Sequence, residues 1–273
     1  MFGTVIAAAF LAAQLLPPSL LDDDGDGMVL AEMRPAVACL DRFHASPEAE
    51  YHVGQLVALM VAQPDDPDFS MPTVAAECIR TVPDSTAAHE WVSTYAIFPL
   101  VMRALARHLA TQSVDIHQLN RTLGPVEVGR AFNMPVAAQD AELIRLAVAA
   151  GVPEHLAGPA TVYAVMRRME PIFDIVVHLP AQPARHIAGS IGTDDYPASA
   201  RRQGLEGRAI VSYTILATGN VQDCEVIIST GHRVLDERTC ALLTARYLFQ
   251  PPRDETGRAV EQRHFTRILW RLR

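Results

Sequence analysis

The 273-residue chain contains no lysine, so all 23 of its basic residues are arginines. Acidic residues number 31, which gives a net charge of −8 at pH 7, and no tract of basic residues occurs. Domains that bind nucleic acids usually carry a basic patch that neutralises phosphates. The acidic balance therefore argues against a nucleic-acid partner. The absence of lysine indicates a bias in nucleotide composition rather than a function.

Common catalytic and metal-binding motifs are also missing. The ten histidines include no H-E-x-x-H motif, and the four cysteines include no C-x-x-C pair, which are spacings typical of zinc sites. Residues 188–192 distantly resemble the nucleophile elbow of hydrolases. That motif requires a strand before it and a helix after it, however, and a linker fits this segment better. We expect a non-enzymatic protein that uses no cofactor.

No hydrophobic run has the length of a clear membrane span. Residues 1–21 are almost entirely apolar, but Pro17 and Pro18 interrupt them after about 16 residues, and a span needs about 20. This length fits a signal peptide better, although no basic residue precedes Arg34. We expect residues 1–21 to be a signal peptide or a weak anchor. The protein is thus predicted to be exported, while its membrane association is left open.

The next segment, residues 22–32, is acidic and resembles the start of an EF-hand calcium loop. Asp22, Asp24 and Asp26 take the oxygen-donor positions 1, 3 and 5 of such a loop. Position 12, which normally holds a bidentate glutamate, is Met33 here. An acidic linker is the alternative interpretation. The three aspartates are therefore a weak calcium candidate, and no metal site is predicted.

Residues 33–175 have the spacing of an all-helical domain of unknown role. Ser46 and Pro47 predict a helix start, because serine is a preferred cap and proline suits the first helical position. Apolar residues then recur at the i, i+3, i+4 spacing of a buried helix face. Further helices are predicted around Cys78 and at 85–111 with an interruption at Pro99, then at 115–123, 138–150 and 160–169.

A domain boundary is predicted at residues 176–190. Prolines at 171, 180 and 183 mark it, and the apolar stretch 172–179 predicts either a strand or an apolar lead-in. The charge changes at the same place, from a net −10 for residues 1–185 to +2 for residues 186–273. We therefore expect a second, small domain at 191–273.

The second domain has an alternating pattern that predicts an α+β fold. Strands are expected at 207–218 and 221–230, a helix at 235–247, and a final strand at 259–272. Gly219-Asn220 between the first two strands predicts a hairpin with a primed turn. Leu235, Thr239, Leu242 and Leu243 share one helix face. The pattern predicts a three-stranded antiparallel sheet with helices on one face.

Six short motifs in this domain share their order and spacing with one known family. They are Tyr196-Pro197-x-x-Ala200, Gly204-x-x-Gly207, Gly219-Asn220-Val221, Ser229-Thr230-Gly231, Leu235-Asp236 and Phe249-Gln250-Pro251. This pattern of about eighty residues resembles the TonB C-terminal domain, and it says nothing about the first 190 residues. In that family the final strand pairs with a short extended segment of an outer-membrane receptor, a mode called β-augmentation.

The resemblance implies a set of partner-binding residues on and beside the final strand. These residues are Tyr196, Pro197, Ala200, Val260, Gln262, His264, Thr266, Ile268 and Trp270. An ordinary edge strand guarded by arginines is the alternative interpretation.

The cysteines bear on the compartment. Cys224 lies on the strand face assigned to the helix, and Cys240 lies in the middle of that helix, so the two can come within disulfide range. Two buried free thiols are the alternative. The resemblance favours the disulfide, because a variant of the family carries a cysteine pair at this position. Cys39 and Cys78 lie in separate helical stretches and are candidates for a second disulfide. Two disulfides imply an oxidising compartment, here the periplasm.

The resemblance implies an energy-transducer-type envelope protein that engages a TonB-dependent receptor in transmembrane transport, with the motor proteins ExbB and ExbD as further partners. The alternative is a soluble periplasmic scaffolding module, able to form a homodimer, that has the fold but transmits no force. TonB itself uses a membrane helix and a long proline-rich spacer, and neither is apparent here. A third hypothesis is a calcium-responsive module that uses the loop with Asp22, Asp24 and Asp26.

Overall fold

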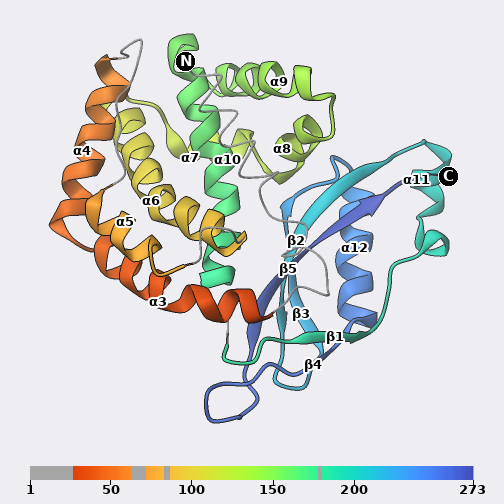
Figure 1. Ribbon diagram of the computed structural model, residues 1–273. Coiled ribbons are helices and arrows are strands. Elements are labelled where there is room, and N and C mark those ends of the chain that lie inside the picture. Colours follow the sequence, from red (N-terminus) through yellow and green to blue (C-terminus); the bar gives the residue numbers. More distant parts are fainter. Residues whose placement is uncertain (1–26, 63–71, 83–86, 178–179, 273) are drawn as a thin grey trace. The chain divides into compact units, whose positions relative to one another are not determined.

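The structure is a computed structural model that describes residues 27–62, 72–82, 87–177 and 180–272 (Figure 1). The predicted signal segment 1–21 and the aspartates Asp22, Asp24 and Asp26 lie outside the described residues. The remainder of the predicted acidic loop, residues 27–32, belongs to the first turns of a helix. No helix among the described residues is both long enough and apolar enough to cross a membrane.

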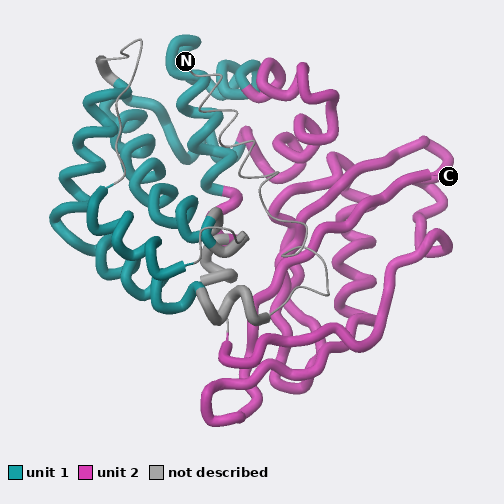
Figure 2. The backbone as a smooth tube through the Cα atoms, viewed as in Figure 1, with its two compact units in different colours: residues 1–15, 28–121, 144–167 teal, residues 16–27, 122–143, 168–273 magenta. Residues whose placement is uncertain are grey.

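The chain divides into two compact units, which Figure 2 colours separately. Unit 1 contains residues 28–121 and 144–167. Unit 2 contains residues 122–143 together with 168 onward. The predicted division into domains 33–175 and 191–273 stays a prediction. The compact units cut across it, because residues 122–143 pack with the C-terminal part of the chain.

Unit 1 is built from helices. They are α3 (Gly27–His44), α4 (Pro47–Ala62), α5 (Thr73–Ile79), α6 (Ala87–Thr111), α7 (Ile116–Thr122), and parts of α9 (Val136–Ala149) and α10 (Glu154–Val177). A disulfide between Cys39 and Cys78 joins α3 to α5, as the sequence suggested. Glu50 of α4 receives an ion pair from Arg103 at 2.7 Å and another from Arg107, and both arginines lie on α6. The disulfide and the ion pairs thus connect helices that are distant in sequence.

The helix boundaries differ from the prediction in two places. Pro99 lies inside α6 and does not end it. A proline removes one main-chain donor from a helix, and here the burial of the neighbouring Ala96 and Leu100 offsets that loss. Residues 172–177, for which a strand or lead-in was predicted, form the end of α10. This prediction was wrong because a short apolar run does not distinguish a buried helix from a strand.

Unit 2 contains a three-stranded antiparallel sheet in the order β3–β2–β5 (Figure 1). The central strand β2 (Gly207–Ile215) pairs with β3 (Val221–Ile228) on one side and β5 (Gln262–Trp270) on the other. Helix α12 (Arg233–Arg246) packs against β3 and buries the four residues predicted for its inner face. The α+β class and the strand–strand–helix–strand order are therefore confirmed, with the strands ending a few residues earlier than predicted.

The hairpin between β2 and β3 is confirmed, but its turn is not the predicted primed type. The Gly219 N–H donates to the Leu216 carbonyl, and the Leu216 N–H donates to the Asn220 carbonyl. Within the turn, residues 216–220, only Gly219 has a positive φ, +88°. The hairpin therefore lacks a primed turn with two central residues at positive φ. Instead, the strands are joined by a longer turn that ends at Gly219, which adopts the left-handed conformation.

Part of the predicted linker 176–190 is a strand. Strand β1 (Arg185–Ala188) pairs antiparallel with β4 (Leu248–Gln250) and forms a second, two-stranded sheet. A short 3₁₀ helix, η1 (Thr193–Asp195), and helix α11 (Ala198–Arg202) follow before β2. A strand of four residues with mostly exposed side chains has too little periodicity to be recognised in the sequence.

Helix α8 (Pro125–Phe132), which the sequence did not predict, belongs to unit 2 and packs against the end of β3. The Ser229 N–H donates to the Pro125 carbonyl at 3.2 Å. Gly129 makes this approach possible, because a Cβ there would come within 2.1 Å of the Ser229 carbonyl oxygen.

The residue after α8, Asn133, takes the place of a strand partner for β2. The Arg208 N–H donates to Asn133 Oδ1 at 2.8 Å, and Asn133 Nδ2 donates to the Arg208 carbonyl at 3.3 Å. Asn133 Nδ2 also reaches the Ser229 carbonyl at 3.4 Å. The side-chain amide thus replaces a peptide group at the point where β3 no longer pairs with β2.

A disulfide between Cys224 and Cys240 joins β3 to α12 and confirms the predicted pair. The bridged cysteines are 16 residues apart, and closing such a loop stabilises a fold by about 3 kcal/mol in the chain-entropy model. The described cysteines include no free thiol. Two disulfides are typical of a protein in an oxidising compartment.

We expect the double variant Cys224→Ser/Cys240→Ser to lose about 3 kcal/mol of unfolding free energy in urea, because its unfolded chain regains the entropy of the open loop. Amide hydrogen exchange in α12 should accelerate. The matched control is Cys39→Ser/Cys78→Ser, which should leave exchange in α12 unchanged. Alkylation of Cys224 or Cys240 in the native protein without reductant would refute the bridge.

We expect Asn133→Ala to lower the unfolding free energy of unit 2 by about 0.5–1.5 kcal/mol, because it removes the hydrogen bonds to the main chain of Arg208 and Ser229. Asn133→Asp keeps the acceptor for the Arg208 N–H but loses the two hydrogen bonds that Asn133 Nδ2 donates to Arg208 and Ser229. If the bond from the Arg208 N–H dominates, this variant should lose less unfolding free energy than Asn133→Ala. The exposed amide Gln203, replaced by alanine, is the control. Urea unfolding followed at β2 and β3 amides measures all three variants, and equal stability of Asn133→Ala and the parent protein would contradict the assigned role.

Candidate partner-binding edge

The structure places most side chains of the predicted binding set in the core of unit 2. Tyr196, Ala200, Gln262, Thr266 and Trp270 are buried, and the other four members, Pro197, Val260, His264 and Ile268, are half-buried. Val260 precedes the first residue of β5. The set, which the resemblance implied, therefore supports the edge strand from within rather than forming an exposed surface.

The β2–β5 register shows which main-chain groups of β5 lack a partner. Arg208 faces Leu269 across the pair, yet its N–H donates to Asn133 on the opposite side of β2. Facing residues in an antiparallel pair exchange either two hydrogen bonds or none. Leu269 therefore directs its N–H and C=O away from β2.

Because the β2–β5 register is unbroken, every second residue of β5 has the same orientation as Leu269. These residues are Arg263, Phe265, Arg267 and Leu269, and we call their outward main-chain groups the outer edge of β5. Within the described part of the chain, no hydrogen bond joins this edge to another segment. The sequence could not identify these four residues, since their orientation follows from the register and not from the side-chain pattern.

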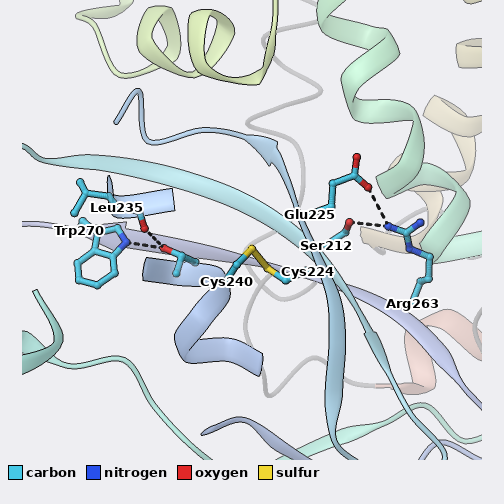
Figure 3. Close-up of a disulfide and its surroundings, with 8 residues drawn as sticks. Ser212, Cys224, Glu225, Leu235, Cys240, Arg263 and Trp270 are labelled. Atoms are coloured by element: carbon cyan, nitrogen blue, oxygen red, sulfur yellow. Dashed lines mark hydrogen bonds and ion pairs between the residues drawn. A yellow bond between two sulfur atoms is a disulfide. The ribbon is translucent and has the colours of Figure 1, made fainter. Parts of the chain in front are cut away.

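A buried hydrogen-bond chain fixes the end of β5 to α12 (Figure 3). Trp270 Nε1 donates to Thr239 Oγ1 at 2.8 Å, and Thr239 Oγ1 donates to the Leu235 carbonyl at 2.9 Å. The Tyr196 ring meets the Trp270 indole edge-on at 5.2 Å between centroids. Aromatic pairs in this geometry and satisfied buried donors both favour one defined position for the strand.

Arg263 connects the three strands on the other face of the sheet (Figure 3). From β5, its Nη2 donates to Ser212 Oγ of β2 at 2.9 Å and pairs with Glu225 of β3 at 3.5 Å. Ser212 is fully buried, whereas Arg263 and Glu225 are about half and two thirds exposed. The ion pair alone contributes little at such exposure. The hydrogen bond to the buried hydroxyl is what fixes the arginine.

Asp195 fixes the segment before β2 to α12. Its carboxylate accepts the Gly192 N–H at 2.9 Å and pairs with Arg246 at 2.7 Å and Arg238 at 3.3 Å. The Gly192 hydrogen bond, followed by the contacts with Arg246, holds the pKa of this carboxyl below its usual range. The adjacent Tyr196 donates its hydroxyl to the Leu205 carbonyl. These contacts position Tyr196 and α11 beside the end of β5.

His264 on β5 lies in a group of rings. Its imidazole is 5.4 Å from the Tyr213 ring and 5.9 Å from the Phe249 ring, and His186 of β1 also contacts Phe249 at 5.3 Å. Burial of the imidazole, together with the nearby charge of His186, lowers the pKa of His264 to about 4. His264 is therefore neutral at pH 7, and it acts as part of the packing.

The region from η1 to the end of β5 matches one family model, described as the Gram-negative bacterial TonB protein C-terminal, over residues 193–272. The C-terminal region belongs to the TonB C-terminal domain family. A solution NMR structure of the Pseudomonas aeruginosa TonB C-terminal domain is 24% identical and covers 33% of this chain and 86% of that chain, with a TM-score of 0.28. No curated protein matches this chain.

Two of the motifs that suggested the TonB C-terminal domain, Ser229-Thr230-Gly231 and Leu235-Asp236, have a clear structural role. Asp236 is buried and accepts hydrogen bonds from the Ser229 hydroxyl and from the Thr230 N–H at 2.9 Å and hydroxyl at 2.8 Å. The two motifs therefore shape the turn between β3 and α12 rather than a binding surface. Among the described residues, no group of His, Cys, Asp and Glu is arranged to hold a metal ion.

We expect the domain to lose stability as pH falls from about 6.5 towards 5. The folded pKa of His264 lies below its unfolded value near 6.5, so the unfolded chain binds more protons in this window. The loss should reach at most roughly 2 kcal/mol at pH 5, and the variant His264→Gln should show a flatter dependence. The exposed His117, replaced by glutamine, is the control. Urea unfolding at several pH values measures the effect, and identical slopes for the parent and His264→Gln would contradict it.

Proposed function

We propose that the TonB-type domain recognises an extended segment of a partner protein by adding it as a strand to the outer edge of β5. The observation that carries this proposal is the row of unbonded main-chain groups at Arg263, Phe265, Arg267 and Leu269. Unpaired groups on an edge strand form a template for another strand, and main-chain hydrogen bonds then supply affinity.

The other outer strand of the sheet, β3, is less available at its end. Pro125 accepts the Ser229 N–H, and the Asn133 side chain contacts the main chain of Arg208 and Ser229. Two bulges also interrupt the pairing of β2 with β3, and bulges discourage the addition of a further strand. β5, with its unbroken register, is the better template.

The family match supports a protein partner, and an outer-membrane receptor segment is the partner we propose. A role in receptor-dependent transport, with force from ExbB and ExbD, and a place in the periplasm or envelope belong to the same proposal. The two disulfides support the compartment. The alternative role, a scaffolding module without force transduction, would use the same edge of β5 but would bind partners other than receptors.

The test uses the full-length chain and N-terminal peptides from TonB-dependent receptors of the same organism. We expect Leu269→Pro to weaken binding at least tenfold, because proline removes a main-chain donor that points to the partner and not to β2. Leu269→Ala, which keeps the donor, is the matched control and should bind within about twofold of the parent.

Backbone amide shifts provide the second readout of this experiment. Bound peptide should shift the amides of Arg263, Phe265, Arg267 and Leu269 more than those of α12. Binding that is equal for the proline and alanine variants, or the absence of any shift at about millimolar peptide, would overturn the proposal. Near-ultraviolet circular dichroism checks that the proline variant keeps its tertiary packing.

A further inference from the structure

The face of β5 that points away from α12 carries exposed positive charge. Arg267 and Leu269 lie on it, and the register places Arg208 of β2 directly beside Leu269. All three are exposed, and the Leu269 side chain reaches 59% exposure. Across the described residues, no carboxylate pairs with Arg267 or with Arg208, whereas Arg263 on the same face is paired with Glu225. We call Arg208, Arg267 and Leu269 the arginine face.

The opposite face of β5 is apolar near the same end of the strand. Ile268 is half-buried there and packs against a cluster that includes Tyr196, Leu235 and Trp270. The side chains of Ile268 and Arg267 thus point to opposite sides of the same edge. One side of the edge offers apolar contact, and the other offers unpaired positive charge.

A strand added to this edge places alternate side chains on the two faces. Side chains that face each other across two strands interact directly, and opposite charges at such positions are stabilising. We propose that the partner is an extended segment in which acidic residues alternate with apolar ones, an inference that rests on the strand addition proposed above. The acidic side chains lie beside Arg267 of the adjacent strand, with Arg208 one strand further away on the same face, and the apolar side chains face Ile268 and the edge of the Trp270 cluster.

The same charges disfavour a second copy of this chain as the occupant. Antiparallel pairing of two β5 strands would bring Arg263 and Arg267 of one copy next to those of the other. Like charges at facing positions are destabilising, and arginines or lysines on an edge are a common defence against self-association. The arginine face therefore selects an acidic partner and rejects its own copy.

The experiment titrates the full-length chain with three synthetic eight-residue peptides in which valine alternates with glutamate, glutamine or lysine. We expect the glutamate peptide to bind about tenfold more tightly than the glutamine peptide, and the lysine peptide to bind most weakly. The variant Arg267→Glu should reverse the order of the glutamate and lysine peptides. Arg233→Glu makes the same charge change on α12, where Arg233 is 86% exposed, and should leave the order unchanged.

The possible outcomes separate this inference from the proposed function. Equal affinity for the three peptides, with binding still sensitive to Leu269→Pro, would overturn the acidic preference and leave strand addition standing. Failure of both these peptides and the receptor peptides would overturn strand addition itself. Analytical ultracentrifugation of the chain alone adds a third outcome. A dimer abolished by Leu269→Pro would show that a second copy occupies the edge and would overturn the inference.

Discussion

A three-stranded sheet has two outer strands, and the hydrogen bonding of their main-chain groups governs the arrangement of unit 2. β2 uses both of its sides, one for β5 and one for β3. Where β3 stops pairing, Asn133 supplies the missing peptide-like partner to Arg208, and Pro125 accepts from Ser229. The end of β3 is thus closed by partners for its main-chain groups, whereas the outer edge of β5 has no such partner among the described residues.

The open edge is useful only if β5 keeps its position, and several interactions serve that end. The Cys224–Cys240 disulfide holds α12 on the sheet, and Trp270 then bonds to Thr239 of that helix. Arg263 ties β5 to β2 and β3 from the other face. Strand addition costs less ordering entropy when the receiving strand is already fixed. The small core of this domain therefore supports a rigid template.

Much of unit 2 could be predicted from local sequence patterns. The period-2 alternation identified β2, β3 and β5, and the helical spacing identified α12. The position of Cys224 and Cys240 on facing elements made their bridge possible, and the resemblance favoured it. The hairpin at Gly219 was expected, although its turn type was not. These features depend on residues near one another in the chain, where periodicity and turn chemistry are informative.

The features that define the candidate site depend instead on contacts between distant residues. The outer edge of β5 follows from its register with β2, whereas the set that the resemblance implied, from Val260 to Trp270, consists of buried and half-buried residues. The sequence contained one weak sign of the role of α8, which is Gly129 inside the helix. A glycine destabilises a helix interior, so its presence there suggests that close packing requires it. No local pattern indicates that Asn133 substitutes for a strand.

The contacts of Asn133 also constrain the order in which the protein can fold. Its partners Arg208 and Ser229 follow it by 75 and 96 residues, and residues 144–167 of unit 1 intervene in the chain. Contacts that close such long loops form slowly. During synthesis α8 emerges long before the strands that receive it. The contacts of Asn133 can therefore form only after β2 and β3 have been synthesised.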